Sequence, residues 1–184
     1  MRRSSFLMVL ASAAVLPAAP SSVRRKLEDI EQKKVPSGQS VRFTRQELLD
    51  FTHEELRAKR VNGIWNPTFT LGANLASGSA TVDFHQLQQS VQGRPPGILS
   101  RLLLSGSRRV DGEVRLSSQR GWARIDLLSV EVDGWNIEGR ALEWMINNYV
   151  LSRYPKARIN EWFELESNVR QVELTPAELT VHIA

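Results

Sequence analysis

Apolar residues recur at helical spacing in two stretches of the chain and alternate with polar residues in most of the rest. At the first stretch, Thr44 and Glu47 form a capping-box pattern, which predicts a helix over residues 45–59. In the second stretch, residues 139–152, the apolar positions form a stripe wider than a surface helix needs. The sequence therefore predicts two amphipathic helices.

Strict alternation of apolar and polar residues is typical of strands that bury one face. A long predicted hairpin turns at Arg120-Gly121, and a second one ends the chain. The order of strands and helices places the fold in the α+β class, and a strongly curved antiparallel β-sheet wrapped around a long amphipathic helix satisfies these periodicities. We expect strands over residues 40–43, 61–65, 68–73, 80–86, 110–116, 122–132, 169–174 and 179–183, with Asn66-Pro67 interrupting the second run.

The start of the chain fits neither pattern. A positive Arg2-Arg3 pair precedes an uncharged, apolar run over residues 6–16, and small residues follow up to Ala19. This layout predicts a secretory signal peptide over residues 1–19, cleaved near its end. The apolar run is shorter than the roughly 20 residues of a membrane span. We therefore expect an exported protein, in the periplasm or outside the cell.

Residues 20–39 are polar and basic and end in Pro-Ser-Gly, so we interpret them as a flexible basic tether. The spacing of Val23, Leu27 and Ile30 would also fit a short helix. The basic side chains are candidates for peripheral contact with a membrane, where each charge contributes about 1 kcal/mol, although a solvated linker is the simpler interpretation. A single folded domain over residues 40–184 follows.

Composition excludes several classes of chemistry. The chain has no cysteine, which excludes thiol catalysis and cysteine-based zinc sites, and a net charge of +4 is too small for a nucleic-acid partner. His53, His85 and His182 lie in three different predicted elements without metal-site spacing. We predict a protein that is not an enzyme and uses no cofactor or metal. A hydrolase would require His53 or His85 to meet a carboxylate and a nucleophile in a cleft.

The closing third of the chain resembles a known group. It contains the run Val-Glu-Val-Asp-Gly-Trp-Asn-Ile at 130–137, a helix over 141–151, Phe-Glu-Leu at 163–165, and alternating segments at 169–172 and 178–181. This layout is similar to small exported proteins of the tubular lipid-binding (TULIP-like) group and to periplasmic relatives of AsmA-type lipid-transport proteins. The resemblance implies a curved sheet around a long helix, an apolar groove for acyl chains, and no catalytic residues.

The apolar stripe of the last helix is the candidate ligand site. We expect the lining to comprise Leu142, Trp144, Met145, Ile146, Tyr149 and Val150, with Trp162, and the headgroup rim to comprise Arg140, Arg153 and Arg158. Met145, Ile146 and Tyr149 would also fit plain core packing. For the tryptophans, a place in the core and a place at a cavity mouth or membrane interface both suit an amphipathic ring.

These patterns predict an exported protein that binds a lipid or fatty-acid-like ligand between helix and sheet, with a role in lipid transport or envelope maintenance. The alternative is a structural or adaptor domain of the cell envelope with a filled core and a protein partner. A void beside Met145 and Tyr149 would favour the lipid carrier, and its absence would favour the adaptor.

Overall fold

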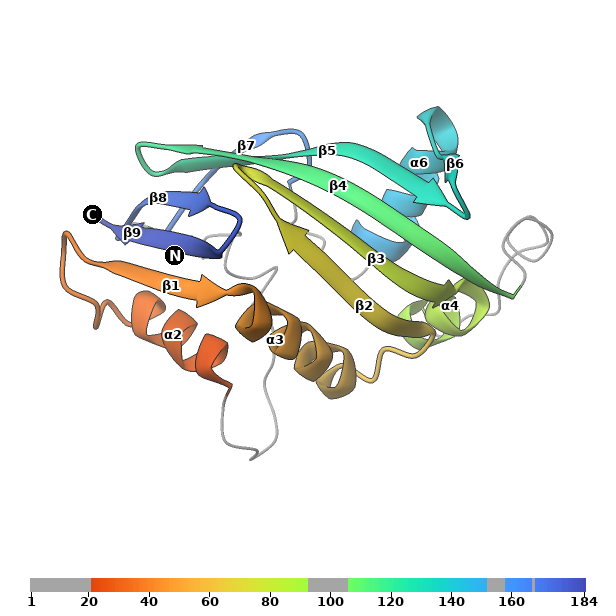
Figure 1. Cartoon of the computed structure of the whole chain (residues 1–184), viewed down its shortest axis with the longest axis horizontal. Helices are drawn as coiled ribbons and strands as arrows, with labels where there is room; N and C mark the ends of the chain where they lie inside the picture. Colours follow the sequence, from red (N-terminus) through yellow and green to blue (C-terminus); the bar gives the residue numbers. More distant parts are fainter. Residues whose placement is uncertain (1–20, 93–105, 152–157, 167) are drawn as a thin grey trace.

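The computed structural model describes residues 21–92, 106–151, 158–166 and 168–184, in which two antiparallel sheets lie next to each other (Figure 1). The larger sheet contains β2 (Ile64–Leu71), β3 (Leu75–Asp83), β4 (Ser107–Gln119), β5 (Trp122–Val132), β6 (Trp135–Asn136) and β7 (Trp162–Glu164). The smaller sheet has the order β1 (Ser40–Thr44), β9 (Glu178–Ile183), β8 (Val169–Leu174). The helical segments are α2 (Ser22–Glu31), α3 (Arg45–Ala58), α4 (Phe84–Gln92), α6 (Gly139–Met145) and the π-helical turn η1 (Ile146–Leu151).

The α+β class and the antiparallel pairing are confirmed. The predicted long hairpin is the pair β4–β5, which turns at Arg120 and Gly121 with φ values of 48° and 81°. Two successive positive φ angles define the tight turn whose twist matches that of the flanking strands. The hairpin therefore forms where the sequence predicts it.

The prediction of a strongly curved sheet wrapped around a long helix is wrong. Within the part of the chain that the structure describes, the last helix comprises the 7 residues of α6 and the 6 residues of η1. At 1.5 Å per residue these segments extend about 20 Å. The 13 residues of β4 extend about 44 Å at 3.4 Å per residue, so the helix covers only one end of the sheet.

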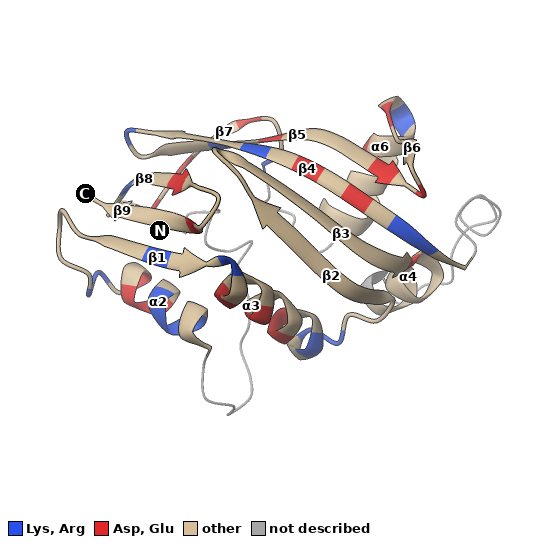
Figure 2. Ribbon diagram, viewed as in Figure 1, with Lys and Arg blue, Asp and Glu red and all other residues tan. Residues whose placement is uncertain are grey.

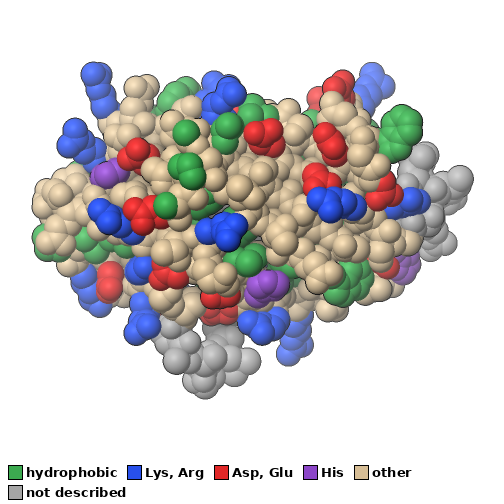
Figure 3. All heavy atoms as spheres, viewed as in Figure 1, with side chains coloured by type: hydrophobic (Ala, Val, Ile, Leu, Met, Phe, Trp, Pro, Cys, Tyr) green, Lys and Arg blue, Asp and Glu red, His purple; other side chains and the backbone are tan. Residues whose placement is uncertain are grey.

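One face of the larger sheet, which we call the groove face, is apolar because its cross-strand pairs match apolar residues with each other. Ala76 lies opposite Val114, and Val110 lies opposite Val132. The opposite, outer face carries charged residues of both signs from the same strand, among them Arg109, Asp111, Glu113 and Arg115. Figure 3 shows side chains of both signs interspersed over the side of the molecule that faces the viewer.

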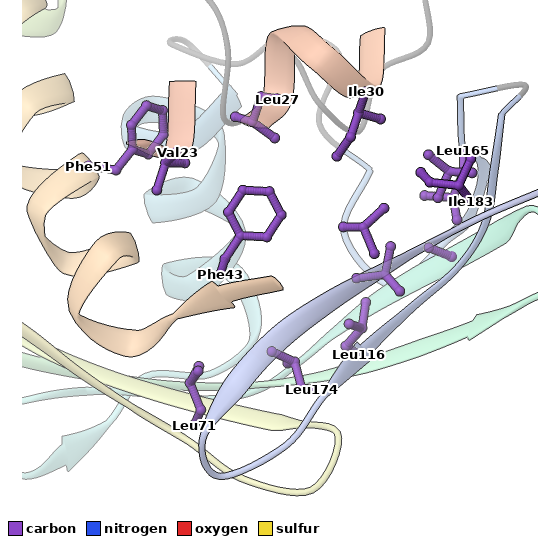
Figure 4. Packing of buried hydrophobic residues seen from close by; sticks show 14 residues of the cluster. Val23, Leu27, Ile30, Phe43, Phe51, Leu71, Leu116, Leu165, Leu174 and Ile183 are labelled. Carbon is purple, nitrogen blue, oxygen red and sulfur yellow. The ribbon is translucent and has the colours of Figure 1, made fainter. Parts of the chain in front are cut away.

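Two buried clusters occupy the two ends of the groove face. The main core contains Val23, Leu27, Ile30, Phe43, Phe51, Leu71, Leu116, Ala123, Leu165, Val169, Val172, Leu174, Val181 and Ile183. The end cluster contains Val82, Phe84, Leu87 and Val132, with Met145 and Tyr149 packed against it. Figure 4 shows the ring of Phe43 in the main core with side chains of α2 and α3 around it.

Residues 21–31 are not a flexible tether, which corrects the prediction for this part of residues 20–39. They form α2, and Val23, Leu27 and Ile30 are at most 3% exposed in the main core. Their spacing places them on one helix face, so the helix buries a continuous apolar stripe. The folded domain therefore includes α2 and begins earlier than residue 40.

Basic side chains of α2 pair with acidic side chains of α3, and Figure 2 marks the positions of these residues on the two helices. Arg24 Nη2 lies 2.8 Å from Glu55 Oε1, and Lys26 Nζ lies 2.7 Å from Glu47 Oε1. Two of the cations that we considered for membrane contact are thus committed to internal ion pairs. These pairs hold α2 against α3.

The strand predicted over residues 80–86 both begins and ends earlier in the structure, as β3 over Leu75–Asp83. β3 ends at Asp83, whose Oδ1 accepts a hydrogen bond from the backbone N–H of Gln86 at 3.0 Å, and α4 begins at Phe84. An aspartate that satisfies a free N–H of the first turn favours a helix start. The side chains of Phe84 and Leu87 then lie in the end cluster.

Candidate functional site

The predicted apolar stripe of the last helix packs against protein. Met145 and Tyr149 contact the end cluster, and the Tyr149 ring centroid lies 5.3 Å from that of Phe84 and 5.6 Å from that of Trp144. These contacts are the ones expected of Met145 and Tyr149 if they pack in a core. Within the described residues these two side chains therefore pack against protein, as the structural or adaptor alternative expects.

The other predicted lining residues do not converge on one place. Leu142 and Ile146 are half-buried, whereas Val150 is 37% exposed. Trp162 lies on β7, opposite Arg124 of β5. The end cluster meets β5 at Val132, eight residues or about 27 Å further along the strand. Trp162 therefore does not belong to a site that the last helix lines.

The hydroxyl group of Tyr149 is buried and has no hydrogen-bond partner among the described residues. Burial raises the pKa of Tyr149 to about 12, because the charged phenolate would lose its hydration. The side chain therefore stays neutral at any ordinary pH. It acts as a packing group and is unsuited to acid–base chemistry near neutrality.

The structure describes two of the three residues of the predicted headgroup rim, Arg140 and Arg158. Arg140 is exposed at the start of α6, and Arg158 Nη1 lies 3.2 Å from Glu161 Oε2. Arg153 lies outside the described residues. Within the described part of the chain, Arg140 and Arg158 share no hydrogen-bond or ion-pair partner.

An apolar groove lies in a different place, between α3 and the groove face of the larger sheet. Its volume is about 460 Å³, within the usual range of ligand sites. α3 supplies one wall, β2 to β5 supply the floor, and Leu174 and Leu179 close the end near the smaller sheet. The lining comprises Leu48, Phe51, Thr52, Phe69, Leu71, Ala76, Ser77, Gly78, Gly112, Val114, Leu127, Leu174 and Leu179.

A pair of glycines leaves the floor of this groove without side chains. Gly78 of β3 lies directly opposite Gly112 of β4. Neither residue has a positive φ, so the backbone conformation does not require glycine at either position. A Cβ at Gly112 would lie 3.7 Å from the Ser129 carbonyl oxygen, an ordinary contact, whereas one at Gly78 would lie 3.2 Å from that of Thr68. At Gly112, open space is therefore the only evident use of a glycine.

The position of α3 over the groove is determined at its N-terminus. The Thr44 hydroxyl accepts from the Glu47 N–H, and Glu47 Oε2 accepts from the Thr44 N–H at 2.9 Å, which confirms the predicted capping box. Burial alone would raise the pKa of Glu47, but hydrogen bonds from Lys26, the Thr44 N–H and Ser22 outweigh it and lower the pKa to about 2. Glu47 therefore fixes the helix start and the α2 contact together.

A serine, a histidine and a glutamate meet on the smaller sheet, although His53 and His85 take no part in this set. Ser40 Oγ lies 2.9 Å from His182 Nδ1, and His182 Nε2 lies 3.4 Å from Glu173 Oε2. Acyl transfer also needs a bound substrate and donors aimed at the developing oxyanion. Ser40 and Glu173 are exposed, and none of the three residues lines the groove. Cross-strand hydrogen bonding is the role that this geometry supports.

The described residues contain no group of three or more His, Asp or Glu side chains arranged to hold a metal ion. Within the same residues, no helix has the length and apolar character needed to cross a bilayer. The chain matches no protein-family model, no curated protein and no solved structure in the comparisons with known proteins. Functional inference therefore rests on the groove and its surroundings.

Proposed function

We propose that this chain is a non-enzymatic binding protein for a lipid or another hydrophobic molecule, and that the groove beneath α3 holds the hydrocarbon part of the ligand. The observation that carries the proposal is Gly112. A glycine inside a strand costs about 0.5–1 kcal/mol relative to alanine, and neither backbone nor neighbours require one here. Its benefit is the open floor that it forms together with Gly78 on the neighbouring strand.

The lining favours a hydrocarbon chain. Of its two hydroxyl side chains, that of Thr52 already donates to the Leu48 carbonyl oxygen at 2.9 Å. None of the described residues that line the groove carries a charge. Each methylene group transferred from water into such a place contributes about 0.8 kcal/mol. Four to five methylenes therefore contribute roughly 3–4 kcal/mol before the costs of association, which corresponds to an affinity in the millimolar range. A polar headgroup would remain outside.

The wider setting belongs to the same proposal. The predicted signal peptide suggests that binding occurs in the periplasm or outside the cell, in lipid transport or envelope maintenance. The resemblance to tubular lipid-binding proteins is kept as part of this proposal, with one change. The ligand site moves from the last helix to the space between α3 and the sheet.

The test is a search for bound lipid in the purified full chain. Native mass spectrometry and solvent extraction should reveal a stoichiometric hydrophobic ligand, or the delipidated protein should bind a fluorescent fatty acid with saturation at one site. A protein that is cooperatively folded, carries no lipid and leaves the probe unbound would contradict the proposal.

A structural or adaptor domain remains the second candidate, because Met145 and Tyr149 pack against the end cluster. This alternative requires no ligand in the groove. The adaptor function would be favoured if a larger side chain in the groove left the binding of lipid and of protein partners unchanged. A loss of lipid on filling would count against it.

A further inference from the structure

A second cavity lies on the outer face, where the two sheets meet. β3 begins at Leu75, and beyond it β8 takes its place beside β4. The Asn74 N–H donates to the Leu174 carbonyl at 3.0 Å, and the Leu116 N–H donates to the Asn74 carbonyl at 2.9 Å. These bonds fix the junction, and a hollow of about 380 Å³ remains beside it.

The sheet-junction hollow, as we call it, is lined by hydrogen-bonding side chains around one indole ring. Its lining includes Asn74, Arg115, Ser117, Gln119, Trp162 and Gln171. None of these side chains is engaged in a hydrogen bond or ion pair with the described residues. Trp162 is 42% exposed, so part of its ring is open to a ligand. Donors, acceptors and an aromatic surface are thus available together.

The charge of the hollow comes from a single arginine. Among the described residues, Arg115 is the one charged side chain of the lining, and none of its other side chains is acidic. Asp126 lies opposite Arg115 on β5 but is paired with Arg124. An unpaired guanidinium beside amides and a hydroxyl suits a ligand with one anionic group and several hydroxyls.

We propose that the sheet-junction hollow binds a saccharide unit that carries one carboxylate or phosphate group. Trp162 packs its ring against the C–H face of the sugar, Arg115 pairs with the anionic group, and Asn74, Gln119 and Gln171 bond the hydroxyls. A nucleic acid fits less well, because phosphate chains need several cations and the outer face also carries Asp111, Glu113 and Glu131. This site is separate from the groove beneath α3.

The experiment is calorimetric titration of the full chain with a linear trisaccharide of a uronic acid and with its neutral counterpart. We expect the acidic sugar to bind at least about tenfold more tightly. Trp162→Ala should weaken both sugars by about tenfold or more, and Arg115→Gln should abolish the preference for the acidic one. Trp122→Ala is the matched control, because Trp122 is also exposed, at 47%, but does not line the hollow.

Three results would overturn the proposal: no binding of either sugar at millimolar concentration, equal losses in Trp162→Ala and Trp122→Ala, or binding of inorganic phosphate as tight as that of the acidic sugar. Binding of the fluorescent fatty acid by each variant shows whether it is folded. If no variant binds that probe, a cooperative denaturation curve with the same midpoint as the wild type shows that the variant is folded.

Discussion

Two amphipathic helical segments lie over the groove face of the larger sheet, and they differ in the residues that lie opposite them. Opposite α6 and η1, Phe84 and Leu87 of α4 pack together with Val82 and Val132 of the sheet. Below α3, Gly78 and Gly112 leave the space open. Whether a cavity exists therefore depends on the residues opposite a helix and not on the width of the helix's own apolar stripe.

The largest effect is expected in the filled region. Phe84 is 3% exposed, so Phe84→Ala should lower the free energy of unfolding by about 3–5 kcal/mol. Urea denaturation followed by tryptophan fluorescence measures this loss. Under conditions where the variant is folded, its affinity for a fatty-acid probe should match that of the wild type. A selective loss of probe binding would move the ligand site to the end cluster.

The second test concerns α2, which packs against α3, the helix that covers the groove. Leu27→Ala should cost about 2–5 kcal/mol, because Leu27 is buried in the main core. Arg25→Ala on the same helix is the control, and an exposed substitution of this kind should stay within about 0.5 kcal/mol. Equal, small effects of the two substitutions would mean that residues 21–31 are a tether after all.

The pH dependence of stability should depend on Glu47 and be smaller than either core effect. Its pKa is about 2 in the fold against an ordinary value of 4.5, so folding favours the ionised form. This contribution is present above about pH 4.5 and is lost as the pH falls towards 2. Denaturation curves between these values should show a shallower decline for Glu47→Gln. Parallel declines would exclude Glu47 as the cause.

The smallest effect is expected at Tyr149. Its buried hydroxyl has no partner among the described residues, so Tyr149→Phe should raise the free energy of unfolding by about 1 kcal/mol or less. Thermal denaturation of the two proteins is the measurement. A clear loss of stability would show that the hydroxyl has a partner and that this end of the molecule is not a purely apolar core.

Local patterns were sufficient for much of the fold. The alternation in β4 and β5 and the turn at Arg120-Gly121 predicted the central hairpin, and the Thr44–Glu47 capping box predicted the start of α3. α4 escaped prediction because Phe84 continues the alternation of Ala80 and Val82 while also beginning a helical pattern. Only the cap at Asp83 distinguishes the two.

The candidate site depended on information that local patterns do not contain. The groove exists because Gly78 and Gly112, 34 positions apart, face each other, and a register shift of one residue would separate them. The sheet-junction hollow similarly requires β8 to follow β3 along the edge of β4. Pairing register between distant strands determined both cavities, and periodicity alone does not specify it.

The most direct test of lipid binding compares Gly112→Leu with Ser129→Leu, which add the same side chain to neighbouring strands on opposite faces of the sheet. Both variants are titrated with the fluorescent fatty acid after their folding has been verified by denaturation. We expect Gly112→Leu to weaken binding by at least about tenfold and Ser129→Leu to stay within about twofold of the wild type. Wild-type affinity in a folded Gly112→Leu variant would contradict a ligand site beneath α3.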